Sequence, residues 1–523
     1  MSQRVLTLLD STESYCRRAA GKYREMFFAA LCAGLVAYGF AMTNILNNQD
    51  NISNTPGGYG AGTASGRWFL EWLAETMRAV WGTNTLPLFN GLLSIALVAL
   101  SACLAASVLE LQSRPFRILT GLLFVTFPSF AMTMLFIFTV GYYSFALLLT
   151  LVGVYVAKKF GLYGIVPGAV CMALALGIYQ AYLPVAAALF LLILLRRGCS
   201  DTPPPARDAF LQGVRFLSVL VLGLLLYLLF LRLSLARSGV VLNDYQQINE
   251  MGSLSLAELP QMFADAYRNF FDLPFRERYA VNSTPLIRFA LLCSLALSCV
   301  LFAWLELRAR AEIKAKLCNL LWFALFPAAT FGIVIMCYHS NIFGRMVYGA
   351  VTAYFLPLVL LECARVQLPR AAVRLPAAAL SALLLLASAN YAWQSNENYM
   401  VLYYTNRQTE NYFASMVSRI RSAPGYRQDL PLAFIGEDIH DSAFANNVYR
   451  RTSHRYGGYS ETSNYLKAGK SYMSHYLGFQ QSTASSETVE ALADSVEVRA
   501  MPCYPDDGSI RVVGGCIVVK LED

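Results

Sequence analysis

The sequence predicts an all-α, polytopic membrane protein that ends in a small α/β domain. Hydrophobic residues make up 56% of the 523 residues and charged residues only 14%, a balance unlike that of soluble domains. Runs of roughly 20 apolar residues recur along the chain, and each can cross the ~30 Å hydrocarbon core as a helix that satisfies its own backbone hydrogen bonds. The first run is too long for a signal peptide and lacks a small-residue cleavage site, so no cleavable leader is expected.

We expect about eleven transmembrane helices within a multi-span domain at 26–393, which follows a cytoplasmic N-terminus at 1–25. Two apolar blocks, 118–157 and 162–195, are nearly continuous, and a break near the middle of each predicts a tight hairpin. The expected spans are 26–46, 88–109, 118–138, 142–157, 162–178, 182–195, 216–231, 286–305, 317–337, 346–361 and 375–392.

Lysine and arginine in the short loops predict the orientation, because cytoplasmic loops of membrane proteins are enriched in these residues. With the N-terminus in the cytoplasm, every cytoplasmic turn is basic. The net charge of +8 is therefore mostly a topology signal, and no nucleic-acid partner is expected. The residues placed inside include Arg17, Arg18, Lys22, Arg24, Arg114, Arg117, Lys158, Lys159, Arg196, Arg197, Arg207, Arg308, Arg310, Lys314, Lys316, Arg365, Arg370 and Arg374.

Two helices are expected to lie flat in the membrane surface, one in an external loop at 47–85 and one in an external loop at 232–288. Each combines apolar residues at helical spacing with charged residues opposite them. An ordinary packed loop helix is the alternative for the second. The apolar positions are Phe69, Trp72, Leu73, Met77, Val80 and Trp81 in the first helix and Leu256, Leu259, Met262, Phe263, Tyr267, Phe270 and Phe271 in the second. Two such helices beside a polar pocket suit an enzyme whose substrate carries a lipid tail.

The tail at 394–523 is polar and long enough for a small exported α/β domain. The stretch LPLAFIGED predicts a buried strand and a turn, and SIRVVGGCIVVKLE predicts two strands around Gly514 and Gly515. Cys503 and Cys516 flank a turn and a strand; a disulfide or two reduced thiols are both open. The histidines of the tail are scattered and show no metal-ligand spacing.

One carboxylate, Asp50, follows the first span within NNQDNISNTPGGYGAGTASGRW. An acid at this depth lines a wet cavity or has a partner, although a capping role is the alternative. The glycines at 57, 58, 60 and 62 free the backbone to present N–H groups to an anion, and Arg67 offers a planar fork suited to phosphate. No strand precedes GYGAG, which excludes a dinucleotide-binding fold.

A carboxylate beside a phosphate-binding loop fits glycosyl transfer from a lipid phosphate. The lipid phosphate leaves as a stable anion and needs little help from an acid. The demanding step is removal of the proton from the acceptor hydroxyl, which one positioned base can perform. This chemistry accounts for one acid where common glycosidases use two.

The same stretch resembles the opening loop of the bacterial glucosyltransferase II family, the serotype-converting O-antigen glucosyltransferases. Further matching pieces are GIYQAYLP at 177–184, FGRMVYG at 343–349, the stretch at 390–420 that begins NYAWQSNENYM, and the ending MPCYPDDGSIRVVGGCIVVKL. The ordered set covers essentially the whole chain. The family is similar in plan to the C-type (GT-C) glycosyltransferases, multi-span enzymes with a catalytic acid in the first external loop.

The resemblance implies transfer of glucose, with inversion, from undecaprenyl-phosphate glucose to a lipid-linked or exported glycan such as the O-antigen of lipopolysaccharide. It implies a multi-pass protein of the bacterial inner membrane with the C-terminal domain outside. Carried onto this chain, the catalytic acid is Asp50. Many C-type enzymes have a second acid nearby, whereas Gln49 and Asn51 flank Asp50 here. This departure argues against a catalytic divalent metal, which prefers clustered oxygen anions, and no cofactor is expected.

The donor phosphate is expected at Arg67, Arg345, Gly58 and Gly60; for Arg345, a snorkelling anchor at the end of a span is the alternative. The sugar is expected at Asn51, Tyr59, Tyr143, Gln180 and Tyr182. Helix packing or an aromatic belt is the alternative for the tyrosines and the glutamine at the turns between spans. If Asp50 is structural, the acid is sought at Asp244, Glu250 or Asp272.

Two other functions remain open. A transporter or flippase for lipid-linked sugar would carry ionisable groups in mid-span and broken helices in matched halves, but the spans carry almost none and no internal repeat is evident. A polyprenyl-dependent glycan polymerase or ligase would show arginine-rich external loops. In the long loop here, arginines at 268, 276 and 278 stand among acids.

Overall fold

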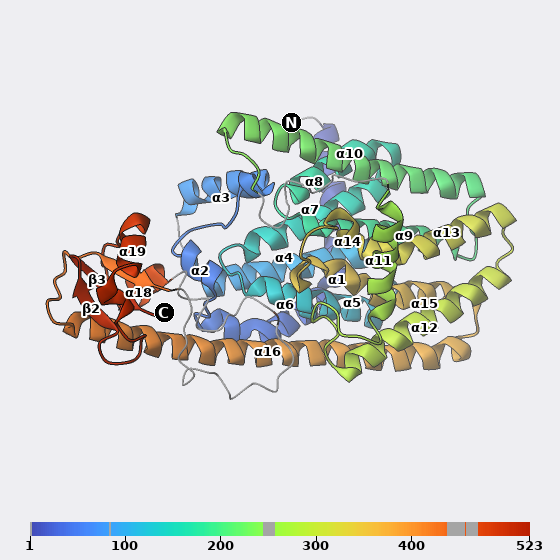
Figure 1. Ribbon diagram of the computed structural model, residues 1–523. Coiled ribbons are helices and arrows are strands. Elements are labelled where there is room, and N and C mark those ends of the chain that lie inside the picture. Colours follow the sequence, from blue (N-terminus) through green and yellow to red (C-terminus); the bar gives the residue numbers. More distant parts are fainter. Residues whose placement is uncertain (1–2, 83–84, 244–256, 437–455, 457–468, 523) are drawn as a thin grey trace. The chain divides into compact units, whose positions relative to one another are not determined.

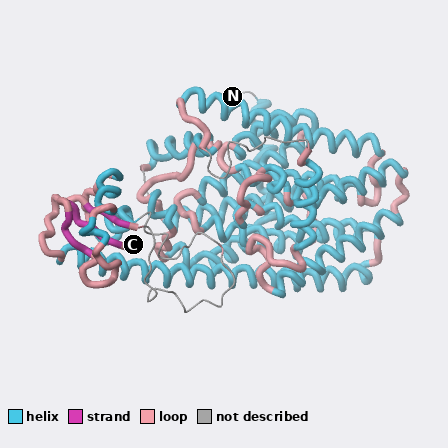
Figure 2. The backbone as a smooth tube through the Cα atoms, in the orientation of Figure 1, coloured by secondary structure: helices cyan, strands magenta, loops and turns pink. Residues whose placement is uncertain are grey.

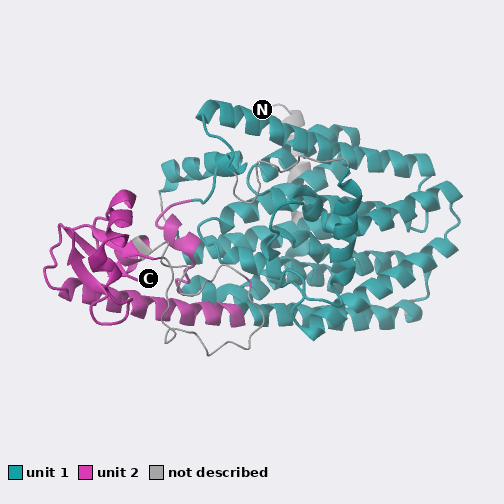
Figure 3. Ribbon diagram, viewed as in Figure 1, with its two compact units in different colours: residues 1–43, 59–396 teal, residues 44–58, 397–523 magenta. Residues whose placement is uncertain are grey.

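The protein divides into two compact units. The computed structural model describes residues 3–82, 85–243, 257–436, 456 and 469–522 (Figure 1). Unit 1 comprises residues 1–43 and 59–396, and unit 2 comprises residues 44–58 and 397–523 (Figure 3). The loop predicted at 47–85 is thus divided between the two units. Its first part, with Asp50, belongs to the segment 44–58, which groups with the C-terminal tail.

Unit 1 is helical, and the strands of the described chain are confined to unit 2 (Figure 2). The helices of unit 1 are α1 (Gln3–Thr43), α3 (Trp68–Trp81), α4 (Pro87–Val108), α5 (Arg114–Thr126), α6 (Pro128–Met134), α7 (Val140–Lys159), α8 (Ile165–Leu176), α9 (Leu183–Gly198), α10 (Ala206–Ser238), α11 (Leu259–Asp272), α12 (Pro285–Arg308), α13 (Ile313–Thr330), α14 (Gly332–Met336), α15 (Phe355–Gln367) and the first half of α16 (Arg370–Ser422).

The prediction of an all-α polytopic membrane protein is confirmed. Among the described residues, eight helices are long and apolar enough to cross a membrane, and the bent pair α5 and α6 makes up to nine. The helices differ in how far the protein covers them: in an 18-residue apolar window only 28% of the residues of α10 are buried, against 89% in the span at Tyr348–Gln367. Exposed leucines and phenylalanines on such helices are the surface that a bilayer covers.

The expected number of about eleven spans is higher than the structure supports, for local reasons. The span expected at 118–138 bends by 42° between α5 and α6, where Pro128 lacks the N–H that a continuous helix needs. The span expected at 162–178 is a shorter apolar helix at Gly161–Leu176. The span expected at 317–337 is divided into α13 and α14, and Pro327 lies in the last turn of α13.

Small residues let the helices of unit 1 approach closely. Buried Ala99, Ala102 and Ala105 line α4 where it packs against α1 and α7. A Cβ atom on Gly153 of α7 would lie 3.1 Å from the carbonyl oxygen of Gly168 in α8. Such contacts replace the hydrophobic driving force that is missing between helices in lipid.

Unit 2 contains a three-stranded sheet. Its strands β1 (Leu432–Ile435), β2 (Ile510–Val513) and β3 (Cys516–Lys520) lie in the order β1-β3-β2, with β1 parallel and β2 antiparallel to β3. Gly514 and Gly515 have φ of +57° and +75° and form the two-residue turn of the β2–β3 hairpin. The strands predicted from LPLAFIGED and SIRVVGGCIVVKLE are confirmed.

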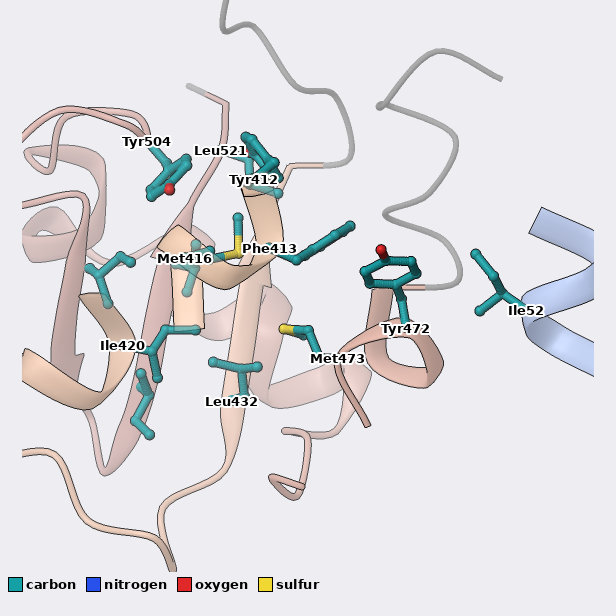
Figure 4. Close-up of a cluster of buried hydrophobic side chains, with 13 residues drawn as sticks. Ile52, Tyr412, Phe413, Met416, Ile420, Leu432, Tyr472, Met473, Tyr504 and Leu521 are labelled. Carbon is teal, nitrogen blue, oxygen red and sulfur yellow. The ribbon is translucent and has the colours of Figure 1, made fainter. Parts of the chain in front are cut away.

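Helices cover both faces of this sheet. The second half of α16 and α18 (Gly469–Leu477) pack on the face that carries Ile517 and Val519 (Figure 4). The helices α19 (Ser486–Ala493) and α20 (Val496–Arg499) pack on the opposite face, where Val518 is fully buried. Cys516 on β3 and Cys503 are both described, and no disulfide joins them.

Candidate functional site

Asp50 lies in the first turn of a short helix, α2 (Gln49–Asn54), in unit 2. The helix begins there because the Asn48 side chain accepts a hydrogen bond from the Asn51 backbone N–H at 2.8 Å. Asp50 is exposed, and within the described residues its carboxylate forms no ion pair or hydrogen bond. Its oxygens therefore remain accessible to a substrate.

The C-terminal half of α16 holds the segment that leads into α2. The Asn406 side chain accepts a hydrogen bond from the backbone N–H of Asn47 at 2.8 Å and donates one to the backbone carbonyl of Asn47 at 2.9 Å. Tyr476 of α18 donates a third hydrogen bond to the Asn47 side chain at 2.9 Å. Ile52 on the buried side of α2 belongs to the hydrophobic core of unit 2 (Figure 4). The position of the acid within unit 2 therefore depends on the tail.

Two other predicted site residues of unit 2 are engaged in the local structure. Asn51 is buried, and its side chain donates to the Leu46 carbonyl at 3.1 Å. Gly58 turns back on α2, and a Cβ atom there would lie 2.4 Å from the Asn54 side-chain oxygen. Both residues thus shape the segment around Asp50, and their roles toward a substrate stay predictions.

In unit 1, a tight loop places Arg67 at the start of α3. The loop includes a 3₁₀ turn, η1 (Thr63–Ser65), and Gly66 with φ of +73°. The Glu71 carboxylate accepts a hydrogen bond from the Thr63 N–H at 2.6 Å. The carbonyl of Gly177 accepts hydrogen bonds from the backbone N–H groups of Phe69 and Leu70 at 2.9 and 3.0 Å. These bonds fix the loop at 62–70 against the turn between α8 and α9.

The Arg67 guanidinium rests on tyrosine rings. Its Cζ lies 5.7 Å from the ring centroid of Tyr143 and 5.9 Å from that of Tyr179, within the range of a cation–π contact. The two rings stack on each other with centroids 4.2 Å apart. The Arg67 Nε atom is buried and has no hydrogen-bond partner among the described residues. This arginine therefore keeps donors that a phosphate could use.

Arg345 reaches the same tyrosine from another part of the chain. Its backbone carbonyl accepts a hydrogen bond from the Tyr179 hydroxyl at 3.3 Å. Its guanidinium lies over Phe136 and Phe343, with Cζ 4.6 and 4.9 Å from the ring centroids. The structure thus brings both arginines proposed for phosphate into contact with Tyr179, which belongs to an aromatic cluster of Tyr143, Tyr179 and Tyr182.

The electrostatic character of this cluster is positive. Neither Arg67 nor Arg345 forms an ion pair with a carboxylate among the described residues, whereas Arg278 and Arg268 do. Burial raises the pKa of the Tyr179 hydroxyl, and the nearby Arg345 and Arg67 oppose that rise. The tyrosine stays neutral at physiological pH, so the two positive charges are not compensated from within the cluster.

The remaining predicted residues of unit 1 occupy different positions. Gln180 is buried and donates to the Ser65 carbonyl at 3.4 Å and to the Tyr227 hydroxyl at 3.2 Å. Tyr182 is 2% exposed and packs edge-on against Tyr179. Gln180 and Tyr182 are thus engaged in packing and hydrogen bonds within unit 1, and a direct contact of either residue with a sugar stays a prediction.

Tyr59 and Gly60 continue the glycine-rich segment in unit 1. The Arg78 guanidinium lies 6.0 Å from the Tyr59 ring centroid. Burial raises the pKa of Tyr59, and the carboxylates of Glu71 and Glu75 add to this effect. Gly60 has φ of +84°, and a Cβ atom there would lie 3.0 Å from the Phe138 ring. A side chain at Gly60 would be strained.

Tyr179, Asn406 and Tyr476 are absent from the predicted site. Tyr179 stands within GIYQAYLP and Asn406 within the stretch at 390–420, two of the pieces that carry the family resemblance. That resemblance is the signal that could have identified these two residues. No comparable signal marks Tyr476, since its partner Asn47 is 429 positions away.

The other acids considered are less suitable as a base. Asp272 forms an ion pair with Arg278, with 2.5 Å between Oδ2 and a guanidinium nitrogen, and this hydrogen bond lowers the pKa of Asp272. Asp244 and Glu250, like Leu256 of the second surface helix, lie outside the described residues. Among the described residues, no three His, Cys, Asp or Glu side chains gather as metal ligands would.

The two predicted surface helices are present, with different surroundings. On α3, Trp72, Val80 and Trp81 are exposed, at 58%, 65% and 74%. On α11, the predicted apolar face is divided: Phe270 packs edge-on against Phe326 of α13, while Phe271 is exposed. The first helix therefore offers an apolar surface that no described part of the protein covers, and the second is largely a packed loop helix.

In a comparison with known protein families, residues 39–359 match the Glucosyl transferase GtrII model. This range contains Asp50, Arg67, Tyr179 and Arg345. Neither a curated protein nor a solved structure matches the chain. The matched range covers more than half of the sequence and agrees with the resemblance stated from its motifs, and we conclude that the chain belongs to the GtrII glucosyltransferase family.

Proposed function

We propose that this glucosyltransferase moves glucose from undecaprenyl-phosphate glucose to an exported glycan such as O-antigen, at the outer face of the bacterial cytoplasmic membrane. The observation that carries the proposal is that Arg67, through its guanidinium, and Arg345, through its backbone carbonyl, both contact Tyr179. Neither arginine forms an ion pair with a carboxylate in the part of the chain that the structure describes. A lone phosphate monoanion or diester is the ligand that two such guanidiniums bind well. A donor with a lipid phosphate supplies it.

The proposed reaction is a single displacement. The acceptor hydroxyl attacks C1 of glucose, the bond from C1 to the phosphate oxygen breaks, and the configuration at C1 inverts. Asp50 takes the proton of the attacking hydroxyl. The electron pair of the broken bond goes to the leaving polyprenyl phosphate, which thereby gains a second negative charge that Arg67 and Arg345 stabilise. Neither a metal nor a cofactor has a step in this scheme.

The exposed apolar residues of α3 support a lipid-borne donor. Trp72 and Trp81 are side chains that favour the headgroup region of a bilayer, and α3 begins one residue after Arg67. A helix in the membrane surface would therefore present the phosphate-binding arginine at the depth of the donor phosphate. The basic residues predicted in the cytoplasmic turns support an outward position for this end of unit 1.

Sugar transfer in proteoliposomes, with synthetic undecaprenyl-phosphate glucose as donor, tests the proposal. The variant Asp50→Asn should lower the transfer rate by about 10²-fold or more, as expected for loss of a general base, while donor binding is retained. Asp507→Asn is the matched control, because Asp507 is an exposed acid of the same unit. Both variants are compared with the wild type at equal folded yield.

Two outcomes would overturn parts of the proposal. If Asp50→Asn transfers glucose at the wild-type rate, Asp50 is not the base. If the wild type moves the labelled lipid across the bilayer without transferring glucose, the transporter alternative replaces the enzyme. Consumption of a diphosphate-linked oligosaccharide in place of the monophosphate donor would favour a polymerase or ligase.

A further inference from the structure

Unit 2 contains a pocket that the proposed reaction does not use. Its volume is about 390 Å³, at the small end of the 300–1,000 Å³ of small-molecule sites. The floor is apolar and includes Leu432 of β1 and Met473 of α18, both 2% exposed (Figure 4). The walls come from α18 and from the segment that follows it, up to Thr483.

The lining of this pocket is polar but uncharged. Six of its ten residues carry a neutral hydroxyl or amide group: Ser471, Ser474, Gln480, Gln481, Ser482 and Thr483. Among the described residues that line it there is no Asp, Glu, Lys or Arg, and His475 is the single titratable side chain. Phosphates and metal ions are bound by charged groups, so this lining favours neither.

Several of these polar groups are available to a ligand. The side chains of Ser471, Ser474 and Gln480 form no hydrogen bond within the described residues. A hydroxyl can donate and accept, and an amide offers donors and acceptors together. Sugar hydroxyls need this mixture, because each of them also donates and accepts. Phe479 adds an aromatic ring to the wall, against which the apolar face of a pyranose can pack.

Hydrogen bonds, mainly between backbone groups, fix the walls of the pocket and do not use the side chains of Ser471, Ser474 and Gln480. The backbone N–H of Leu432 donates to the Ser482 carbonyl at 2.8 Å, and the N–H of Ala484 donates to the Leu432 carbonyl at 2.9 Å. The N–H of Phe479 donates to the Met473 carbonyl at 2.9 Å. The Gln481 amide donates to the carbonyl of Gln428 at 3.0 Å. A pocket built in this way is preorganised, which lowers the cost of binding.

We infer that this pocket of the tail binds one or two neutral sugar units of the acceptor glycan. The inference rests on the proposed function, because an exported glycan is the neutral, hydroxyl-rich partner that the transferase requires. An apolar lipid tail would leave the hydroxyl and amide groups unpaired, and a nucleotide or free phosphate would find no cationic side chain. Binding here gives a long acceptor a second attachment point, which raises its effective concentration.

Saturation-transfer NMR on the full-length protein in lipid nanodiscs tests the inference. The probes are neutral di- to tetrasaccharides of glucose, galactose, mannose and rhamnose, with uridine monophosphate as the charged comparison. Ser474→Trp fills the pocket and should abolish the sugar signal. Gln480→Ala, in an exposed position, should weaken binding by roughly three- to tenfold, the loss expected for one neutral hydrogen bond. Ser415→Trp on the exposed face of α16 is the matched control.

A parallel transfer assay separates the pocket from the enzyme. Loss of sugar binding in Ser474→Trp, with a raised KM for a polymeric acceptor and an unchanged kcat, supports the inference. Wild-type binding in Ser474→Trp, or no binding of any sugar probe by the wild type, overturns it even if glucose is transferred normally. If sugars bind in the pocket but no glucose is transferred, the pocket stands and the proposed function fails.

Discussion

Replacing Asn406 by alanine tests whether the tail holds the segment that carries Asp50. Asn406 bonds both the N–H and the carbonyl of Asn47, and Asn47 is 5% exposed. A buried backbone group left without a partner costs about 1–3 kcal/mol. Loss of both bonds should therefore destabilise the segment at 44–54 by about 2–6 kcal/mol, reduced by any hydrogen bonds that water forms in their place. We expect much faster amide exchange in α2 and a lower transfer rate.

Hydrogen exchange followed by mass spectrometry on the full-length protein measures this effect. Asn411→Ala, an exposed asparagine on the same helix, is the control and should leave exchange in α2 unchanged. Exchange in β3 should be unaffected in both variants, since the sheet does not contact Asn47 through these bonds. If Asn406→Ala leaves the protection of residues 47–54 at the wild-type level, the tail does not hold this segment and the reasoning is wrong.

Three further perturbations follow from unit 1. Arg345→Ala should raise the KM for donor by roughly 10- to 100-fold, as for a lost charge-assisted hydrogen bond, measured by donor titration in the transfer assay; an unchanged KM would remove Arg345 from the donor site. Gly177→Ala should lower thermal stability, because its Cβ would lie 2.8 Å from Trp68 and from Phe69. By contrast, Gly141→Ala should be neutral or stabilising, because its Cβ would make an ordinary van der Waals contact with Leu93 at 3.9 Å. Because the pKa of Asp272 is lowered in the folded protein, its ion pair with Arg278 should stabilise the end of α11 fully above the unfolded pKa of ~3.9. This stabilisation should be lost as the pH falls through the folded pKa. Amide exchange in α11 that does not depend on pH in that range, after correction for intrinsic rates, would contradict the prediction.

Features with local causes could be predicted from the sequence. Two adjacent glycines between alternating β-branched residues specify the β2–β3 hairpin, because only glycine accepts positive φ at both turn positions at little cost. The helical spacing of Phe69, Leu73, Met77 and Val80 similarly predicts α3. The polytopic class follows from apolar run lengths alone, although Pro128 and Pro327 reduce how many runs become continuous spans.

The assembly of the site could not be predicted in the same way. Tyr179 contacts Arg67 and Arg345, which lie 112 and 166 positions away from it in the sequence. No local pattern encodes such contacts, which arise when separate helices pack. The assignment of residues 44–58 to the unit of the tail has the same origin, because Asn47 and Asn406 are 359 positions apart. The roles of Arg67 and Arg345 could be predicted because a guanidinium suits phosphate, whereas nothing in the sequence indicated that both residues contact Tyr179.

The support of Arg67 and Arg345 by aromatic rings has a consequence for how the protein responds to its surroundings. Arginine keeps its proton at any pH at which a cell grows, so the positive charge at this cluster does not depend on acidity. The field of a partly exposed charge does depend on dissolved salt, which shortens its reach from ~10 Å at 0.1 M to ~3 Å at 1 M. Under the proposed function, binding of the anionic donor should therefore weaken as the ionic strength of the medium rises.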